Sequence, residues 1–242
     1  MSRKSRRNRP HPERQGPHAD NASEASRRRR SIVIGAVVAV LLAVLVGTLL
    51  FKGDRSQSSP GATITNQDPL ASVHSPMLGD AGAKVHIVEF IDPACETCAQ
   101  FFPYVKQLMA ENPNRIRLSI RHVAFHDGSD YVVKLLEASR KQDKYLPTME
   151  ALLASQAHWA PHHTVQPDLV LQAIAGVGLN IEQLLVDMNA PEVAQRMEQD
   201  RNDAVTLKVT ATPEYFVNGR PMPSFGLQQL QTLVSEALQS AY

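Results

Sequence analysis

Residues 89–98 read EFIDPACETC, and this stretch joins a predicted strand to a predicted helix through a pair of cysteines. The strand is expected over residues 84–91, which are rich in β-branched and aromatic side chains. The helix is expected over residues 95–111, where apolar side chains recur at nearly helical spacing. The two cysteines of the chain, Cys95 and Cys98, therefore fall in the first turn of a helix that follows a strand.

The start of a helix favours an ionised cysteine. Its first N–H groups have no partner within the helix, and its dipole is positive at that end. A thiol placed there can have its pKa lowered from about 8.5 into the range of about 3.5–7.5. Cys95 is thus predicted to be the attacking thiolate, and Cys98 is predicted to resolve the mixed disulfide.

A cysteine pair at this spacing has three other uses in proteins. A purely structural disulfide would close too small a loop to constrain the unfolded chain much. A zinc site completed by His122 and His126 would need a spacer of about 12–15 residues, whereas 23 residues separate Cys98 from His122. Copper(I) delivery by two exposed thiolates stays open as an alternative.

The rest of the chain predicts a mixed α/β domain with a helical insertion at about residues 127–208. A second strand is expected at 115–125, a third at 215–217, and a turn at Asn218-Gly219. Asn180 followed by Gln183 resembles a helix capping box. Trp159, within the histidine-rich stretch 158–163, is expected to pack on the core of the insertion or at the edge of a substrate surface. The further expected helices are 129–144, 146–156, 168–175, 181–188, 192–207 and 227–238.

The first part of the 242-residue chain has a different character from the rest. Residues 1–30 hold ten of the 25 Lys and Arg, and residues 31–51 are uncharged and mostly apolar. Twenty-one helical residues would span about 31 Å, against about 30 Å for the hydrocarbon core of a bilayer. The arginines at 27–30 place the N-terminus in the cytoplasm by the positive-inside rule. The sequence predicts an uncleaved anchor rather than a signal peptide, which has a shorter apolar stretch and a small-residue cleavage site.

Residues 1–30 are expected to be a disordered cytoplasmic tail, and residues 52–75 a flexible linker. No aromatic residue interrupts the basic residues of the tail, so nucleic-acid binding is not expected. The globular domain is expected over residues 76–242, on the outer side of the membrane. Because the basic residues gather in the tail, the whole-chain net charge of +1 does not describe this domain.

The segment 89–98 resembles the active-site strand, turn and helix of the thioredoxin fold, in its DsbA-like branch. Glu89 lies six residues before Cys95, where the family keeps a buried carboxylate, and Pro103 lies eight residues after it, where the family's helix is kinked. Thr212 and Pro213, followed by EYFVNG, are similar to the family's cis-proline loop and hairpin. The 118 residues from Cys95 to Pro213 leave room for the helical insertion of that branch.

The resemblance implies an enzyme that exchanges disulfides with protein substrates, without a bound cofactor or metal. Together with the predicted anchor, it predicts a single-pass protein of a bacterial inner membrane whose catalytic domain is periplasmic or otherwise extracytoplasmic. It implies that Glu89 relays the proton of Cys98, and that Thr212, Pro213, Glu96 and Thr97 face the substrate. It also implies a membrane redox partner, either a quinone-linked oxidase or a membrane reductant. The resemblance does not imply whether the enzyme acts as an oxidase, a reductase or an isomerase.

The two residues between the cysteines depart from the family pattern. Thioredoxins usually have Gly-Pro there and the strongly oxidising DsbA type has Pro-His, whereas this chain has Glu96-Thr97. The charge of Glu96 is expected to raise the pKa of Cys95, which would make the pair less oxidising than the DsbA type. Two alternatives to an oxidoreductase remain: a copper-delivery protein, and a membrane-tethered binding module in which the cysteines are incidental.

Overall fold

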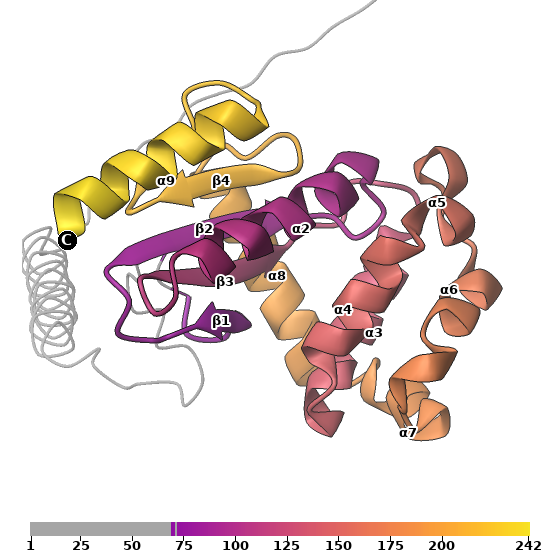
Figure 1. Ribbon diagram of the computed structural model, residues 1–242. Helices are drawn as coiled ribbons and strands as arrows, with labels where there is room; N and C mark the ends of the chain where they lie inside the picture. Colours follow the sequence, from indigo (N-terminus) through magenta and orange to yellow (C-terminus); the bar gives the residue numbers. More distant parts are fainter. Residues whose placement is uncertain (1–68, 71) are drawn as a thin grey trace, which may run out of the picture. The chain divides into compact units, whose positions relative to one another are not determined.

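The computed structural model describes residues 69–70 and 72–242, and it has a five-stranded mixed sheet at its centre (Figure 1). The strand order is β1-β3-β2-β4-β5. The central strand β2 (Val85–Ile91) runs parallel to β3 (Ile116–His122) and antiparallel to β4 (Glu214–Val217). Two short strands, β1 (Met77–Gly79) and β5 (Arg220–Pro221), close the edges in antiparallel pairs.

Each face of the sheet is covered by helices. On one face, α2 (Glu96–Glu111) and α9 (Leu227–Ala241) pack on the larger apolar core together with Ile87 and Ile91 of β2. On the other face, Phe90 packs with residues of α8 (Pro191–Thr206) in a second, smaller core. Alternate residues of β2 point to opposite faces, so this strand, which is buried on both sides, is mostly apolar. Its polar residues are His86 and Glu89, and Glu89 enters the larger core.

The predicted helical insertion is confirmed and lies to one side of the sheet (Figure 1). Trp159 is fully buried, and its indole N–H donates to the carbonyl of Leu152, so the expectation that it packs on the core is met. The Asn180 side chain accepts a hydrogen bond from the N–H of Gln183, as the capping pattern predicted. Besides α8, the helices of the insertion are α3 (Ser129–Ser139), α4 (Tyr145–Ala154), α5 (Gln156–Trp159), α6 (Pro167–Ala173) and α7 (Ile181–Asp187). The insertion also has 3-10 turns at Arg140–Gln142, Pro161–His163 and Ala175–Val177.

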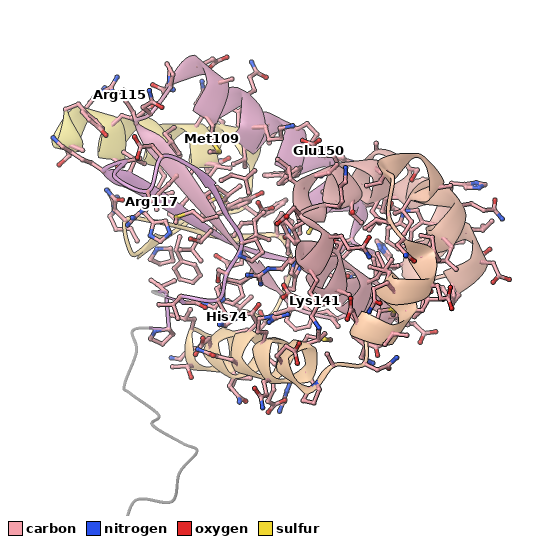
Figure 2. All side chains as sticks on the ribbon, turned by 90° about the horizontal axis from the view of Figure 1, so that it is seen from below. His74, Met109, Arg115, Arg117, Lys141 and Glu150 are labelled. Carbon is pink, nitrogen blue, oxygen red and sulfur yellow. The ribbon has the colours of Figure 1, made fainter. Side chains whose placement is uncertain are left out.

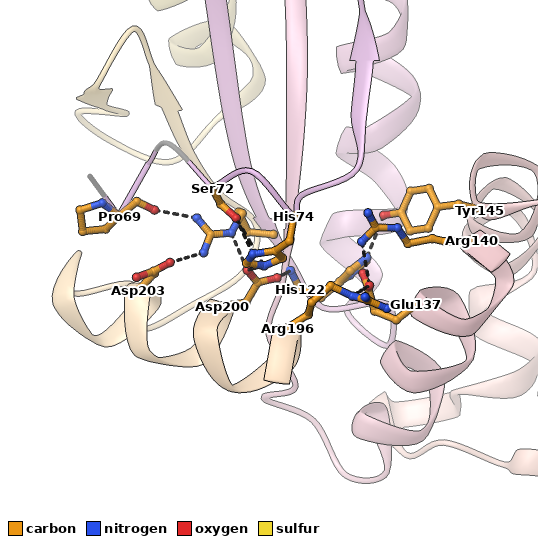
Figure 3. Close-up of polar contacts among 11 residues, drawn as sticks. Pro69, Ser72, His74, His122, Glu137, Arg140, Tyr145, Arg196, Asp200 and Asp203 are labelled. Atoms are coloured by element: carbon orange, nitrogen blue, oxygen red, sulfur yellow. Dashed lines mark hydrogen bonds and ion pairs between the residues drawn. The ribbon is translucent and has the colours of Figure 1, made fainter. Parts of the chain in front are cut away.

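The last residues of the predicted linker contact the domain. Asp200 on α8 accepts hydrogen bonds from Arg121 Nε at 2.6 Å and binds His74 Nε2 at 2.7 Å, while Asp203 pairs with the same arginine. Arg121 also donates to the carbonyl of Pro69 at 2.6 Å. Figure 2 shows His74 beside α8, and Figure 3 shows this buried cluster. The packed part of the chain thus includes Pro69 and His74, which lie before the predicted domain start at residue 76.

The expected tail, anchor and most of the linker fall on residues 1–68, outside the part of the chain that the structure describes. Within residues 69–70 and 72–242, none of the helices combines the length and the apolar character needed to span a membrane.

Candidate active site

The turn after β2 brings Cys95 to the start of α2. Cys95 has extended backbone angles (φ −82°, ψ 120°) and is the residue that caps the helix, while Cys98 lies in its first turn. Residues 97 and 98 therefore present their backbone N–H groups toward the Cys95 sulfur, as the sequence predicted. Cys95 keeps 5% of its surface exposed and Cys98 none, so an approaching molecule can reach only the first sulfur.

The surroundings of Cys95 favour its thiolate. A hydrogen bond from the Cys98 thiol is the largest of the effects that lower the pKa of Cys95 to about 5. The Thr212 side chain and the backbone N–H groups of Thr97 and Cys98 act in the same direction, against the effect of burial. Glu96, which was expected to raise this pKa, is exposed to solvent and is not among the groups that set it. The expectation that Glu96 raises the pKa of Cys95 is therefore wrong, and Cys95 is an acidic thiol.

Cys98 has the opposite character. Burial, followed by the neighbouring Cys95 and the charge of Glu89, raises the pKa of Cys98 well above its ordinary value. It therefore remains a thiol while Cys95 is a thiolate. The pair is divided into an acidic nucleophile with a small exposed surface and a fully buried thiol that needs a proton acceptor before it can react.

Glu89 enters the larger core from the centre of β2 and is fully buried rather than solvated. Its Oε1 accepts a hydrogen bond of 2.8 Å from the hydroxyl of Tyr215 on β4. Burial raises the pKa of Glu89 to about 8, and the charge of Cys95 adds to the increase while Tyr215 opposes it. A carboxyl group with such a pKa can both give and take a proton near neutral pH.

Thr212 and Pro213 come from a distant part of the chain to face Cys95. The peptide bond between them is cis, as expected. The Sγ of Cys95, when protonated, donates to the carbonyl oxygen of Thr212 at 3.3 Å. The other predicted substrate contacts, Glu96 and Thr97, lie in the first turn of α2, exposed and half-buried respectively. The structure thus brings Thr212 to the start of α2, where Cys95, Glu96, Thr97 and Cys98 lie, while Glu89 is close enough for its charge to act on Cys98.

The family model described as Thioredoxin matches residues 71–236. The chain belongs to the thioredoxin family. A thioredoxin-like oxidoreductase from Silicibacter pomeroyi DSS-3 has a solved structure that is 32% identical, with a TM-score of 0.63, and the match covers 72% of this chain and 99% of the other. The probable disulfide bond formation protein D of Bacillus anthracis is 22% identical over 78% of this chain and 88% of its own length. The resemblance to DsbA-like thiol–disulfide oxidoreductases is thereby confirmed.

Other curated relatives carry a different name. The Na(+)/H(+) antiporter NhaA of Herminiimonas arsenicoxydans is 26% identical over 86% of this chain, which spans 33% of the length of the antiporter. A match to a third of a protein does not carry its transport activity to the matched part.

The turn between β2 and α2 is held by Asp92, a residue that the sequence did not predict to belong to the site. Asp92 is fully buried, and its carboxylate accepts hydrogen bonds from the backbone N–H groups of Ala94, Phe125 and His126, and from the Ser129 hydroxyl. Its contact with the His126 ring is 2.7 Å. A carboxylate directly after a buried strand was the signal in the sequence that could have pointed to this role.

The insertion holds the same turn from the other side. The carbonyl of Ala94, the residue before Cys95, accepts hydrogen bonds from Gln156 at 2.6 Å and from His163 at 3.2 Å. The His163 ring stacks on His126 with 4.6 Å between ring centres. The two hydrogen bonds to Ala94 join residues that are more than 60 positions apart, and no local pattern in the sequence predicts them.

Proposed function

We propose that this thioredoxin-family domain is an extracytoplasmic enzyme that exchanges disulfides with protein substrates through Cys95 and Cys98. The observation that carries the proposal is the division of the pair into an acidic, accessible Cys95 and a buried, protonated Cys98. Thr212 and Pro213, next to the Cys95 sulfur, offer a backbone against which an extended substrate segment can align.

The direction that these groups favour is oxidation of the substrate. A substrate thiolate attacks Cys95 in the Cys95–Cys98 disulfide; the new S–S bond joins substrate and Cys95, and Cys98 leaves and takes up a proton. A second substrate thiolate then attacks the substrate sulfur of that bond, forms the substrate disulfide and releases the Cys95 thiolate. Stabilising that thiolate stabilises the reduced enzyme, and a stabilised reduced form makes its disulfide a better oxidant.

The surface around the site suits protein substrates rather than small molecules. Phe225 is 55% exposed and stacks on Phe101 of α2, while Phe125 is exposed next to the turn held by Asp92. Two surface hollows of about 380 Å³ each lie elsewhere, one lined by Arg220 and Glu236 among others and one by Met77 and Met109 among others. Unfolded chains expose apolar side chains that can bind such aromatic surfaces.

We place the domain outside a bacterial inner membrane, anchored by residues 31–51. The support is the length of that uncharged segment and the four arginines before it. Since the chain has no cysteine besides the pair, reoxidation requires an external partner, for which a quinone-linked membrane oxidase is proposed; a membrane reductant would take its place if the enzyme runs in the opposite direction.

The proposal is tested by refolding reduced ribonuclease in the presence of the oxidised protein. We expect the wild type to restore ribonuclease activity, and the Cys95→Ser variant to be inactive with its fold intact. Thiol trapping in cells should find the pair mostly as a disulfide. Tight copper(I) binding without any disulfide exchange would instead favour copper delivery, although the complete burial of Cys98 does not suit an ion held by two exposed thiolates.

A further inference from the structure

Five buried side-chain polar atoms lack a hydrogen-bond partner among the residues that the structure describes, and two of them belong to a carboxyl group and an imidazole on the neighbouring strands β2 and β3. One is Oε2 of Glu89, a side chain with no exposed surface, and the other is Nδ1 of His122, which is 2% exposed. Leaving such atoms unpaired is unfavourable, so each calls for an explanation.

The two side chains lie on the same face of the sheet. In the parallel pair of β2 and β3, Glu89 is opposite Ile120, and Ile91 is opposite His122. Residues two positions apart point to the same face, so Glu89 and His122 are diagonal neighbours with about 8 Å between their Cα atoms, a separation that two long side chains can bridge. Burial first, and then the charges of Glu137 and Glu89, raise the pKa of Tyr145, the hydrogen-bond partner of His122.

The contacts of Tyr145 favour a proton on Nε2 of His122. The Tyr145 oxygen lies 2.8 Å from Nε2 of His122 (Figure 3). Because the hydroxyl donates its hydrogen to Sδ of Met149 at 3.3 Å, we assign the proton between the two rings to Nε2. Burial lowers the pKa of His122, which keeps the ring neutral. A neutral ring with its proton on Nε2 has a free acceptor at Nδ1.

Glu89 can supply the proton that Nδ1 of His122 can accept. Its Oε1 accepts from Tyr215, and burial raises its pKa to about 8, so at neutral pH it carries a proton, which Oε2 is free to donate. A carboxyl group that already holds a proton cannot accept one from Cys98. Glu89 must therefore pass its proton on before the Cys98 thiol can ionise.

We propose that His122, oriented by Tyr145, accepts the proton of Glu89 at Nδ1 through one bridging water, and so allows Glu89 to take the proton of Cys98. The O–H bond of Glu89 breaks and an N–H bond forms on His122; the S–H bond of Cys98 then breaks and the O–H bond of Glu89 reforms. The Cys98 thiolate attacks the mixed disulfide on Cys95, and the partner sulfur leaves as a thiolate. His122 is a positioning residue and proton acceptor in this scheme, which rests on the proposed function.

The charged groups around His122 are compatible with a transient imidazolium. Glu137 on α3 and Asp200 on α8 favour its charged form, as does Asp92 after β2, whereas Arg140 opposes it. Arg140 and Arg196 both donate to one Glu137 oxygen, which balances that carboxylate (Figure 3). In the reverse reaction the same atoms return the proton to Cys98.

Reaction with Ellman's disulfide reagent separates the two steps in one stopped-flow trace. Release of the first thionitrobenzoate reports attack by Cys95, and release of the second reports attack by Cys98. For His122→Leu we expect an unchanged first phase and a second phase slowed on the order of tenfold below about pH 8, with the difference disappearing above that pH, where Glu89 is ionised without help.

The matched control is His86→Leu. His86 lies on the same strand as Glu89 but bonds to Ser119, and we expect both phases to match the wild type. If the folded His122→Leu variant has a normal first phase and an unchanged second phase, the proton transfer from Glu89 to His122 is overturned, while the proposed function stands. Absence of the first phase in the wild type would overturn the proposed function instead.

A measurement on the unaltered protein covers the case in which His122→Leu does not fold. The ¹⁵N spectrum of histidine-labelled wild type should show His122 as the neutral form protonated on Nε2, with the Nδ1 signal responding to the ionisation of Glu89. A His122 protonated on Nδ1 at neutral pH would overturn the proposal, because the acceptor would then be absent.

Discussion

Cys95 and Glu89 are both removed from bulk solvent, yet their pKa values move in opposite directions. Burial opposes the charged form of each, but Cys95 receives hydrogen bonds from Cys98 and from backbone N–H groups, and its pKa falls to about 5. Glu89 has one donor, Tyr215, and its pKa rises to about 8. The supply of hydrogen-bond donors, more than burial itself, separates the nucleophile from the proton acceptor.

The raised pKa of Glu89 predicts a pH-dependent loss of stability. Below about pH 4.5 the carboxyl is protonated in both states; between about 4.5 and about 8 the unfolded chain loses the proton while the folded protein keeps it. Stability from this group therefore decreases with rising pH, by about 1.4 kcal/mol per pH unit. Glu89→Gln removes the titration, so its stability relative to wild type should increase from pH 5 to pH 8.

Urea unfolding of the two reduced proteins at several pH values measures that difference. The titration of Cys95 is present in both proteins, so to first order it cancels in the comparison. A stability difference that stays constant across this range would show that Glu89 is ionised in the folded protein at neutral pH, against the account given above.

For single residues, the sequence predicted the groups that react but not the residues that hold them in place. The positions of Cys95, Cys98 and Glu89 follow from one local stretch, and Thr212 and Pro213 follow from a second one. The hydrogen bonds by which Asp92 and His163 hold the turn before Cys95 join distant segments of the chain, and the spacing of residues in the sequence does not predict them. The influence of Glu96 was overestimated because its exposure to solvent could not be read from the sequence.

Among the elements, α8 attaches the start of the domain to the sheet through Asp200. That carboxylate binds the fully buried Arg121, the His74 ring and the backbone N–H of His122. Removing one member of a buried ion pair leaves the other charge uncompensated, which costs about 3–5 kcal/mol.

For Asp200→Ala we therefore predict destabilisation of about that size in urea unfolding, with faster hydrogen exchange in β1, which begins three residues after His74. Glu198→Ala is the matched control, since Glu198 lies on the same helix and pairs with Arg201 at the exposed surface. It should leave stability nearly unchanged. Equal effects of the two substitutions would contradict a special role for the buried cluster.

The elements that sequence reasoning missed are the shortest ones. The strand β1 has three residues and β5 has two, too few for an alternating pattern to stand out, and β5 contains a proline. They are defined by pairing with β3 and β4. The long predicted helices were found because periodicity over several turns is a strong signal, although 129–144 ends as an α-helix at Ser139 and continues as a 3-10 turn.

For the whole molecule, the acidity of Cys95 predicts where the enzyme stands among its relatives. A pKa of about 5 lies between about 7 for thioredoxin and about 3.5 for DsbA. The redox potential should accordingly lie between about −270 and about −120 mV. Equilibration with glutathione buffers, followed by alkylation of free thiols, measures this redox potential. A value outside the interval would show that the acidity of Cys95 does not set the potential of the pair.

The assignment as a whole depends on Cys95 being an acidic and accessible thiol. Its most direct test is the rate of iodoacetamide reaction with the reduced protein as a function of pH, with mass spectrometry to locate the label. We predict labelling at Cys95 with a midpoint near pH 5, and an unreactive Cys98. A midpoint near the value of about 8.5 for free cysteine, or equal labelling of both residues, would contradict the account.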